Sequence, residues 1–224
     1  MDYLTLEEIE ANFIENRNRS LWDKLRNKFI IGVNDNYDIY ELKYFPGETA
    51  AVILTNKVYN SALFTHELMH LDLRHRGLHT LLFYQSLSEH FITTMAVTIL
   101  NCIEHVLFFD EFVELGYRKE EFVMDYNNSE YELTMLKKLY SQIKSSKNRS
   151  LVELCYTYAY WTLKNEEYMG VNRYTDLSWL KKTNPTLFLK CENMFDNIIE
   201  FDLDSPTVQD DFITLMSRYL RRNY

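Results

Sequence analysis

Apolar side chains recur at helical spacing from the start of the chain. Thr5 and Glu8 form a capping box, a sequence pattern that marks the first turn of a helix. The apolar positions that follow lie on one side of such a helix: Leu6, Ile9, Phe13 and Ile14. Helical spacing returns over residues 21–29, so the pattern predicts two helices before residue 30.

The pattern changes between residues 30 and 55, where β-branched and aromatic side chains replace the helical periodicity. Gly32 and the pair Pro46–Gly47 interrupt this region, as is typical of turns between strands. Strand-like runs occupy residues 30–33, 37–45 and 49–55. We therefore expect two or three short strands that form a small sheet.

Strand signals almost vanish after residue 60, and helical periodicity dominates the rest of the chain. A helix is expected over residues 60–75, ending near Gly77. A second capping box, Ser86 to Glu89, opens a long apolar helix that runs to about residue 109. Further helices are predicted at residues 130–146, 150–164, 186–199 and 207–222.

These elements predict an α+β fold that is predominantly helical. A small sheet and the helix at residues 60–75 come first, and a helical array follows. We expect one compact domain over residues 1–224, because no flexible linker or low-complexity tract interrupts the chain. Within this domain, residues 1–115 would hold the sheet, and residues 116–224 would form a helical C-terminal part.

Composition narrows the possible functions. The chain has 224 residues, 46% of them hydrophobic, and a formal net charge of −9. Broad nucleic-acid binding and an anionic membrane surface both require clustered basic side chains, so this charge argues against them. The acidic start is unlike a secretory signal, and no apolar run has the length of a membrane span. We therefore expect a cytoplasmic protein, whose three cysteines are buried free thiols.

The chemistry of the sequence concentrates in the stretch Phe64-Thr-His66-Glu67-Leu-Met-His70. On a helix, residues four apart lie one turn above each other, so His66 and His70 project from the same face. Two such imidazoles can occupy two corners of a zinc tetrahedron. Glu67 lies about 100° around the helix, beside the metal, where its carboxylate can take a proton from water. The alternative is a helix that carries two histidines on its solvent face.

A strand followed by a helix with His-Glu-x-x-His resembles the zincin metallopeptidases, over residues 50–110. The resemblance implies that His66 and His70 are zinc ligands and that Glu67 is the general base. Independently of the resemblance, the β-rich run at residues 51–55 precedes the motif and could supply an edge strand beside the cleft. Asp72 departs from the family, which usually has an apolar residue there. The small acidic form is similar in type to intracellular bacterial metallopeptidases that cut a repressor.

A catalytic zinc site needs a third protein ligand, and two positions compete for this role. Ser88-Glu89-His90 is the weaker candidate, because Glu89 already closes the capping box with Ser86. Glu104 and His105 lie in an otherwise apolar helix, where a metal would compensate for the burial of ionisable groups.

Asn101 shares a helix face with this pair and could orient the ligand. A resemblance to Asn-x-x-x-His in related bacterial sequences favours His105, with Glu104 as the alternative. A buried His–Glu pair without metal is the other explanation.

The sequence thus predicts a zinc-dependent metallopeptidase that acts on a protein or peptide. A zinc-binding interaction or regulatory protein without turnover is one alternative, and a zinc hydrolase of a non-peptide amide or ester is another. Weaker candidates for the cleft are His75 and His79, which are as readily explained as loop histidines. Three tyrosines could donate to a developing oxyanion: Tyr84, Tyr117 and Tyr126.

Overall fold

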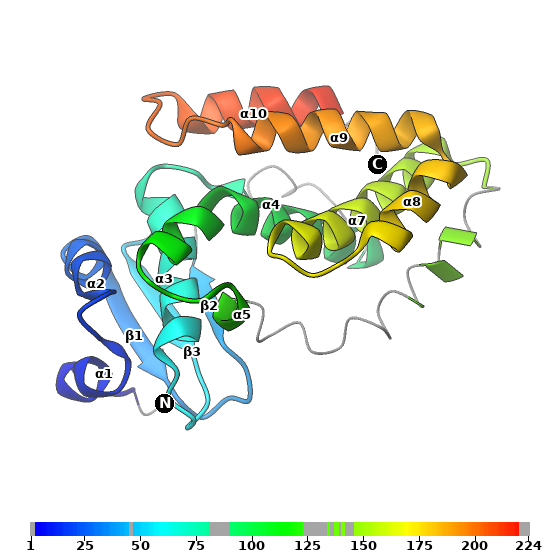
Figure 1. Cartoon of the computed structure of the whole chain (residues 1–224). Helices are drawn as coiled ribbons and strands as arrows, with labels where there is room; N and C mark the ends of the chain where they lie inside the picture. Colours follow the sequence, from blue (N-terminus) through cyan, green and yellow to red (C-terminus); the bar gives the residue numbers. More distant parts are fainter. Residues whose placement is uncertain are drawn as a thin grey trace. The chain divides into compact units, whose positions relative to one another are not determined.

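The computed structural model combines a three-stranded sheet with helices, as the sequence predicts (Figure 1). It describes residues 3–44, 47–80, 90–122, 134, 137–138, 140–141 and 146–219. The observed fold is predominantly helical and of the α+β class, which confirms the predicted class.

The chain divides into two compact units, each built from two separate segments. The first unit comprises Met1–His79 and Phe108–Met124, and the second comprises Thr80–Leu107 and Asp125–Tyr224. The boundary between Leu107 and Phe108 falls inside one continuous helix, α4 (His90–Glu114). The expectation of one domain over residues 1–224 stays a prediction.

The sheet of the first unit has the order β1-β3-β2. Its strands are β1 (Ile30–Asn34), β2 (Glu41–Tyr44) and β3 (Ala50–Leu54). β3 pairs with β1 in parallel, with Gly32 opposite Val52, and with β2 in antiparallel orientation, with Leu42 opposite Ile53. The run expected to supply an edge strand is therefore the central strand of this sheet, and β1 and β2 form its two edges. The prediction was wrong here because strand order depends on pairing between distant segments, which periodicity does not encode.

Besides the sheet, the described part of the first unit contains three whole helices of eight or more residues: α1 (Leu6–Phe13), α2 (Arg19–Arg26) and α3 (Ser61–His75). The capping box between Thr5 and Glu8 is present at the start of α1. Asn60 caps α3, because its side chain accepts hydrogen bonds from the first-turn amides of Ala62 and Leu63.

Helix α3 is the centre of this unit. It packs against α1, α2, β2, β3 and the short helix α5 (Lys119–Phe122). Eleven of its fifteen residues are buried, so polar side chains on it are held inside the protein. It ends at His75, and Gly77 follows with a φ of 92°, which favours glycine over any residue with a side chain.

Among its described residues, the second unit contains the N-terminal part of α4 and four further helices. These are α7 (Arg149–Tyr168), α8 (Tyr174–Thr183), α9 (Pro185–Ile199) and α10 (Val208–Tyr219). Helices α7, α8 and α9 pack on one another, and α10 packs on α9. Three predicted C-terminal helices are confirmed, whereas α8 was not predicted. The capping box at Ser86 and most of the helix at 130–146 lie outside the described residues.

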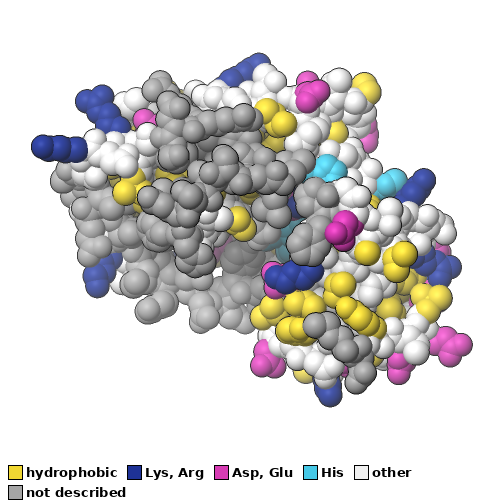
Figure 2. All heavy atoms as spheres, turned by 180° about the vertical axis from the view of Figure 1, so that it is seen from behind, with side chains coloured by type: hydrophobic (Ala, Val, Ile, Leu, Met, Phe, Trp, Pro, Cys, Tyr) yellow, Lys and Arg dark blue, Asp and Glu magenta, His cyan; other side chains and the backbone are white. Residues whose placement is uncertain are grey.

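All three cysteines are free and buried, as predicted. Among the described residues, no helix has both the length and the apolar character to cross a membrane. Apolar side chains gather on part of the surface in Figure 2. Four residues of the loops that flank β2 and β3 expose large apolar side chains: Tyr37, Ile39, Val58 and Tyr59.

Candidate metal centre

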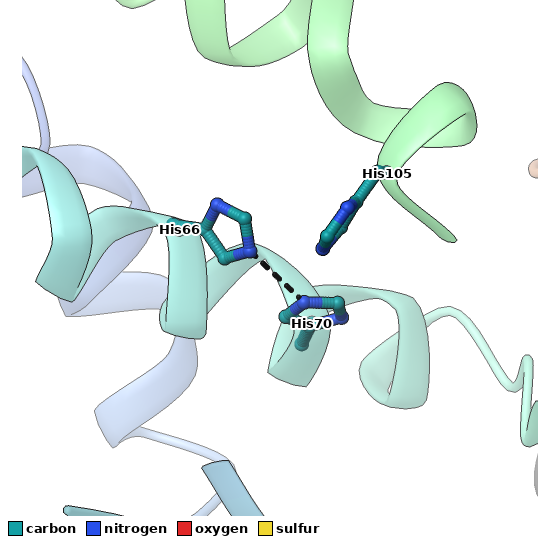
Figure 3. Close-up of side chains that lie close together, drawn as sticks. All are labelled: His66, His70 and His105. Atoms are coloured by element: carbon teal, nitrogen blue, oxygen red, sulfur yellow. Dashed lines mark hydrogen bonds between the residues drawn. The ribbon is translucent and has the colours of Figure 1, made fainter. Parts of the chain in front are cut away.

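Three histidines converge in the structure. His66 and His70 project from the same face of α3, and their Nε2 atoms lie 3.2 Å apart. His105 reaches toward this pair from α4, as Figure 3 shows. One nitrogen from each of the three rings lies within 4.8 Å of the other two, so the group could bind a metal ion. The sequence predicted each of these three residues as a ligand.

The spacing of the first two nitrogens fits a tetrahedral metal site. Zinc–imidazole bonds of about 2.0–2.1 Å place two nitrogens of a tetrahedron about 3.3–3.4 Å apart. The observed 3.2 Å between His66 and His70 is close to this separation. The three rings each place a nitrogen within 4.8 Å of the others, so His105 would approach by up to about 1.5 Å to complete three corners.

Aromatic packing holds α4 against α3 next to the histidines. Phe108, which belongs to the first unit, presents its ring nearly perpendicular to both His66 and His70, with ring centroids 5.6 Å and 4.9 Å away. One turn further along α4, Glu111 forms a two-pronged ion pair with Arg76 at the end of α3. His105 lies three residues before Phe108 on the same continuous helix. The contacts of Phe108 and Glu111 therefore hold the C-terminal part of α4 against α3.

Burial keeps the imidazole of His66 neutral. The side chains of the three histidines are buried, with exposed fractions of 5%, 7% and 3% for His66, His70 and His105. Burial, and then the charge that His70 would carry, place the pKa of His66 well below its usual range. A neutral imidazole is the form that donates a lone pair to a metal, so the site favours ligation near neutral pH.

Glu67, the predicted general base, is also buried, with 6% of its side chain exposed. Its Oε2 atom accepts a hydrogen bond of 2.7 Å from the backbone N–H of Leu42 in the edge strand β2. A carboxylate has about four acceptor positions, so one hydrogen bond fixes its direction without using its capacity to accept a proton. The edge strand therefore orients this carboxylate, a role that the sequence gave no sign of.

The two residues that competed as third ligand have different surroundings. Glu104 is buried, and its carboxylate accepts a hydrogen bond from the hydroxyl of Thr80. His105 belongs to the group of three histidines and lies 3.4 Å from the side-chain amide of Asn165 on α7. Asn101, the predicted supporting residue, is exposed on α4, and Asn165 stands beside His105 instead. Asn165 was not predicted.

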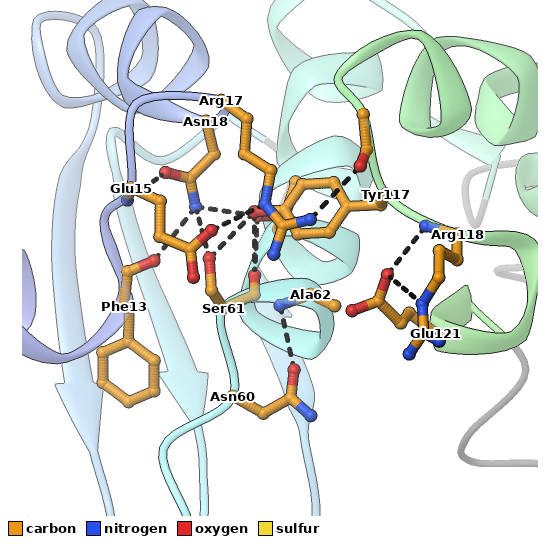
Figure 4. A network of polar contacts seen from close by, with 12 residues as sticks. Phe13, Glu15, Arg17, Asn18, Asn60, Ser61, Ala62, Tyr117, Arg118 and Glu121 are labelled. Atoms are coloured by element: carbon orange, nitrogen blue, oxygen red, sulfur yellow. Dashed lines mark hydrogen bonds and ion pairs between the residues drawn. The ribbon is translucent and has the colours of Figure 1, made fainter.

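A polar network fixes the start of α3 (Figure 4). The buried amide of Asn18 donates to Ser61 and Thr65, and the hydroxyl of Tyr117 lies 2.8 Å from both of their hydroxyl oxygens. The guanidinium of Arg17 stacks 3.8 Å from the centre of the Tyr117 ring. Burial raises the pKa of the Tyr117 phenol. Because Thr65 directly precedes His66, this network anchors the turn that carries the first ligand.

Asp72, the departure from the zincin pattern, has a structural role. Its buried carboxylate forms ion pairs with Lys24 of α2 and with Arg76, 2.9 Å away, one turn later in α3. These pairs tie α2 to the end of α3. The position therefore stabilises the helix that carries the ligands without belonging to the group of histidines.

The other residues that the sequence suggested for the cleft either are not part of the group of three histidines or lie outside the described residues. The rings of His75 and His79 pack against Phe29 and Tyr44, with centroids 6.4 Å and 5.9 Å apart, respectively. Of the tyrosines proposed as oxyanion donors, Tyr117 belongs to the network at the start of α3. Tyr84, Tyr126 and the side chains of the weaker ligand pair, Glu89 and His90, lie outside the described residues.

Comparisons with known proteins found no family model, curated protein or solved structure that matches the chain. The function therefore has to be argued from the residues of the site. These residues define a buried group of three imidazoles, with a carboxylate one residue from the first of them.

Proposed function

We propose that the chain is a zinc-dependent metallopeptidase, with His66, His70 and His105 as ligands. The convergence of three buried imidazoles carries this proposal. Three protein ligands leave one corner of a tetrahedron for water or substrate, the arrangement that catalytic zinc sites share. Histidine nitrogens suit zinc better than calcium or magnesium, which prefer oxygen ligands.

The ion would polarise the substrate carbonyl and make a water molecule more acidic. Glu67 supplies the proton transfers that this chemistry needs. Its carboxylate takes a proton from the attacking water and passes it to the nitrogen of the leaving amine, so the C–N bond breaks without releasing an amide anion. The hydrogen bond from Leu42 keeps the carboxylate in one orientation while it exchanges the proton.

A metal site without turnover is the second candidate, and the burial of the site favours it. The three histidines expose 7% or less of their side chains. The ring of Phe122 packs against His66 with centroids 4.6 Å apart. A structural site is closed by a fourth protein ligand, whereas a catalytic site keeps one position for solvent or substrate.

Zinc content and peptide hydrolysis, measured on the same preparations, test the proposal. The purified full-length chain would be loaded with zinc and incubated with a mixture of unstructured peptides, and the products identified by mass spectrometry. We expect Glu67→Gln to keep its zinc and lose hydrolysis by at least about 100-fold. Its amide oxygen can still accept from Leu42, so the substitution removes the proton acceptor while preserving the contact. His66→Ala should lose both zinc and hydrolysis.

Glu120→Gln is the matched control, because it makes the same chemical change at an exposed position on α5. It should retain both zinc and hydrolysis. Full hydrolysis by Glu67→Gln would refute the role of Glu67. Stoichiometric zinc without cleavage of any peptide by the unsubstituted protein would favour the metal site without turnover.

A further inference from the structure

We propose that Asn165 is a positioning residue that, by turning its amide oxygen toward His105, holds the tautomer in which the Nε2 atom of this ring is the third metal ligand. The inference rests on the proposed metal centre and adds a residue from a different helix to it. Asn165 lies on α7, sixty positions after His105 in the chain, and does not belong to the motif from His66 to His70.

The contact is made inside the protein. The Nδ2 atom of the Asn165 side-chain amide lies 3.4 Å from the Nδ1 atom of His105, and the exposed fractions of the two residues are 0% and 3%. Nδ1 and Nε2 are the only polar atoms of an imidazole. A group fixed at Nδ1 therefore decides which nitrogen carries the proton of the neutral ring.

The two ends of the amide have opposite effects on that proton. When the oxygen of Asn165 faces His105, Nδ1 carries the proton and donates it to the amide, and the lone pair is on Nε2. When the NH₂ group faces the ring, as it does in this structure, Nδ1 accepts, and the proton is on Nε2, where it blocks ligation. The two ends have nearly the same shape, so the chemistry of the ring decides between them. A metal at Nε2 selects the first arrangement.

The end of α7 is built to hold this side chain in place. Glu166, next to Asn165, is buried and pairs with Arg173, the residue that precedes α8. Asn165 also accepts a backbone hydrogen bond of 3.1 Å from Met169 in the last turn of α7. A buried charge pair one residue away restrains this turn, so the side chain of Asn165 stays beside His105.

Zinc affinity of three full-length variants tests the proposal, measured by competition with a chromophoric chelator. Asn165→Leu keeps similar volume but removes the acceptor, and should bind zinc about 10–100-fold more weakly. Asn165→Asp restores an acceptor for Nδ1–H and should bind zinc at least as tightly as the unsubstituted protein.

Thr162→Val is the control for damage to α7. Thr162 is also buried, and its hydroxyl donates to the backbone of Tyr158 within its own helix. Zinc affinity of this variant should stay within about twofold of the unsubstituted protein, because a lost hydrogen bond inside the helix does not act on His105.

A measurement on the unsubstituted protein, without and with zinc, needs no substitution at Asn165. Nitrogen-15 NMR, with the signal of His105 assigned from His105→Gln, should find the proton on Nε2 before any metal is added and on Nδ1 after zinc is loaded. A proton that remains on Nε2 after zinc is loaded, or equal zinc affinity of Asn165→Leu and the unsubstituted protein, would overturn the proposal. Failure of the unsubstituted protein to bind zinc would instead refute the metal centre itself.

Discussion

The neutral state of His66 predicts that metal-free protein loses stability as the pH falls below about 6.5. Burial and the neighbouring His70 hold the pKa of His66 well below its usual range in the folded state. The unfolded chain has the ordinary histidine pKa of about 6.5, so it binds more protons than the folded chain in mildly acidic solution. Protonation therefore favours unfolding, and the stability present at neutral pH is lost as the pH decreases.

The size of the stability loss follows from the histidine pKa of the unfolded chain. If the folded state takes up no proton at His66 between about pH 7 and about pH 5.5, the free energy of unfolding falls by about 1.3 kcal/mol over that range. His66→Gln removes the titrating group, and its stability should fall by about 1.3 kcal/mol less than that of the unsubstituted protein. The comparison cancels contributions from groups that the substitution leaves unchanged.

Urea unfolding in the presence of a chelator measures this difference. Trp22 is buried in the first unit, with its ring centroid 6.1 Å from that of Phe64 on α3, and its fluorescence reports unfolding around the histidines. Phenylalanine at the other two tryptophans, Trp161 and Trp179, leaves it as the only reporter. Equal losses of stability in the unsubstituted protein and in His66→Gln would refute the argument that burial keeps His66 neutral.

Two further substitutions test what supports the site. Phe108→Ala removes a buried ring that packs on His66 and His70. The free energy of unfolding, measured by urea titration, should fall by about 3–5 kcal/mol. A loss below about 1 kcal/mol would show that this packing is unimportant. Asp72→Asn removes a buried charge that pairs with Lys24 and Arg76. The free energy of unfolding should fall by about 1–3 kcal/mol, while zinc still binds. Unchanged stability would contradict the structural role of these pairs.

The sequence predicted those helices whose caps or apolar faces are formed by residues close together in the chain. The capping box at Thr5 and the helical periodicity over residues 60–75 are properties of neighbouring residues, and the two helices that they predict are present. Helix α8 was missed because its start carries no such signal: Arg173 precedes it, and no side chain caps its first turn. The order of the strands was missed because it is decided by pairing between β3 and two distant segments.

The same distinction applies to the site. The four-residue spacing of His66 and His70 predicts their common face, since both lie on one helix. His105 could be named only as one of two adjacent ionisable residues, because helix packing decides which of them meets α3. Two supporting contacts left no pattern in the sequence. Leu42 acts through its backbone N–H, which every non-proline residue has, and Asn165 meets His105 only after the chain has folded.

X-ray absorption spectroscopy at the zinc edge, on the zinc-loaded full-length chain, tests the metal centre most directly. We expect one zinc ion per chain, with three imidazole nitrogens at about 2.0–2.1 Å and a lighter, non-protein oxygen as the fourth neighbour. His105→Ala should lose this signature, and Glu104→Ala should keep it. Absence of bound zinc, or a site that survives His105→Ala and is lost in Glu104→Ala, would contradict the ligand set of His66, His70 and His105.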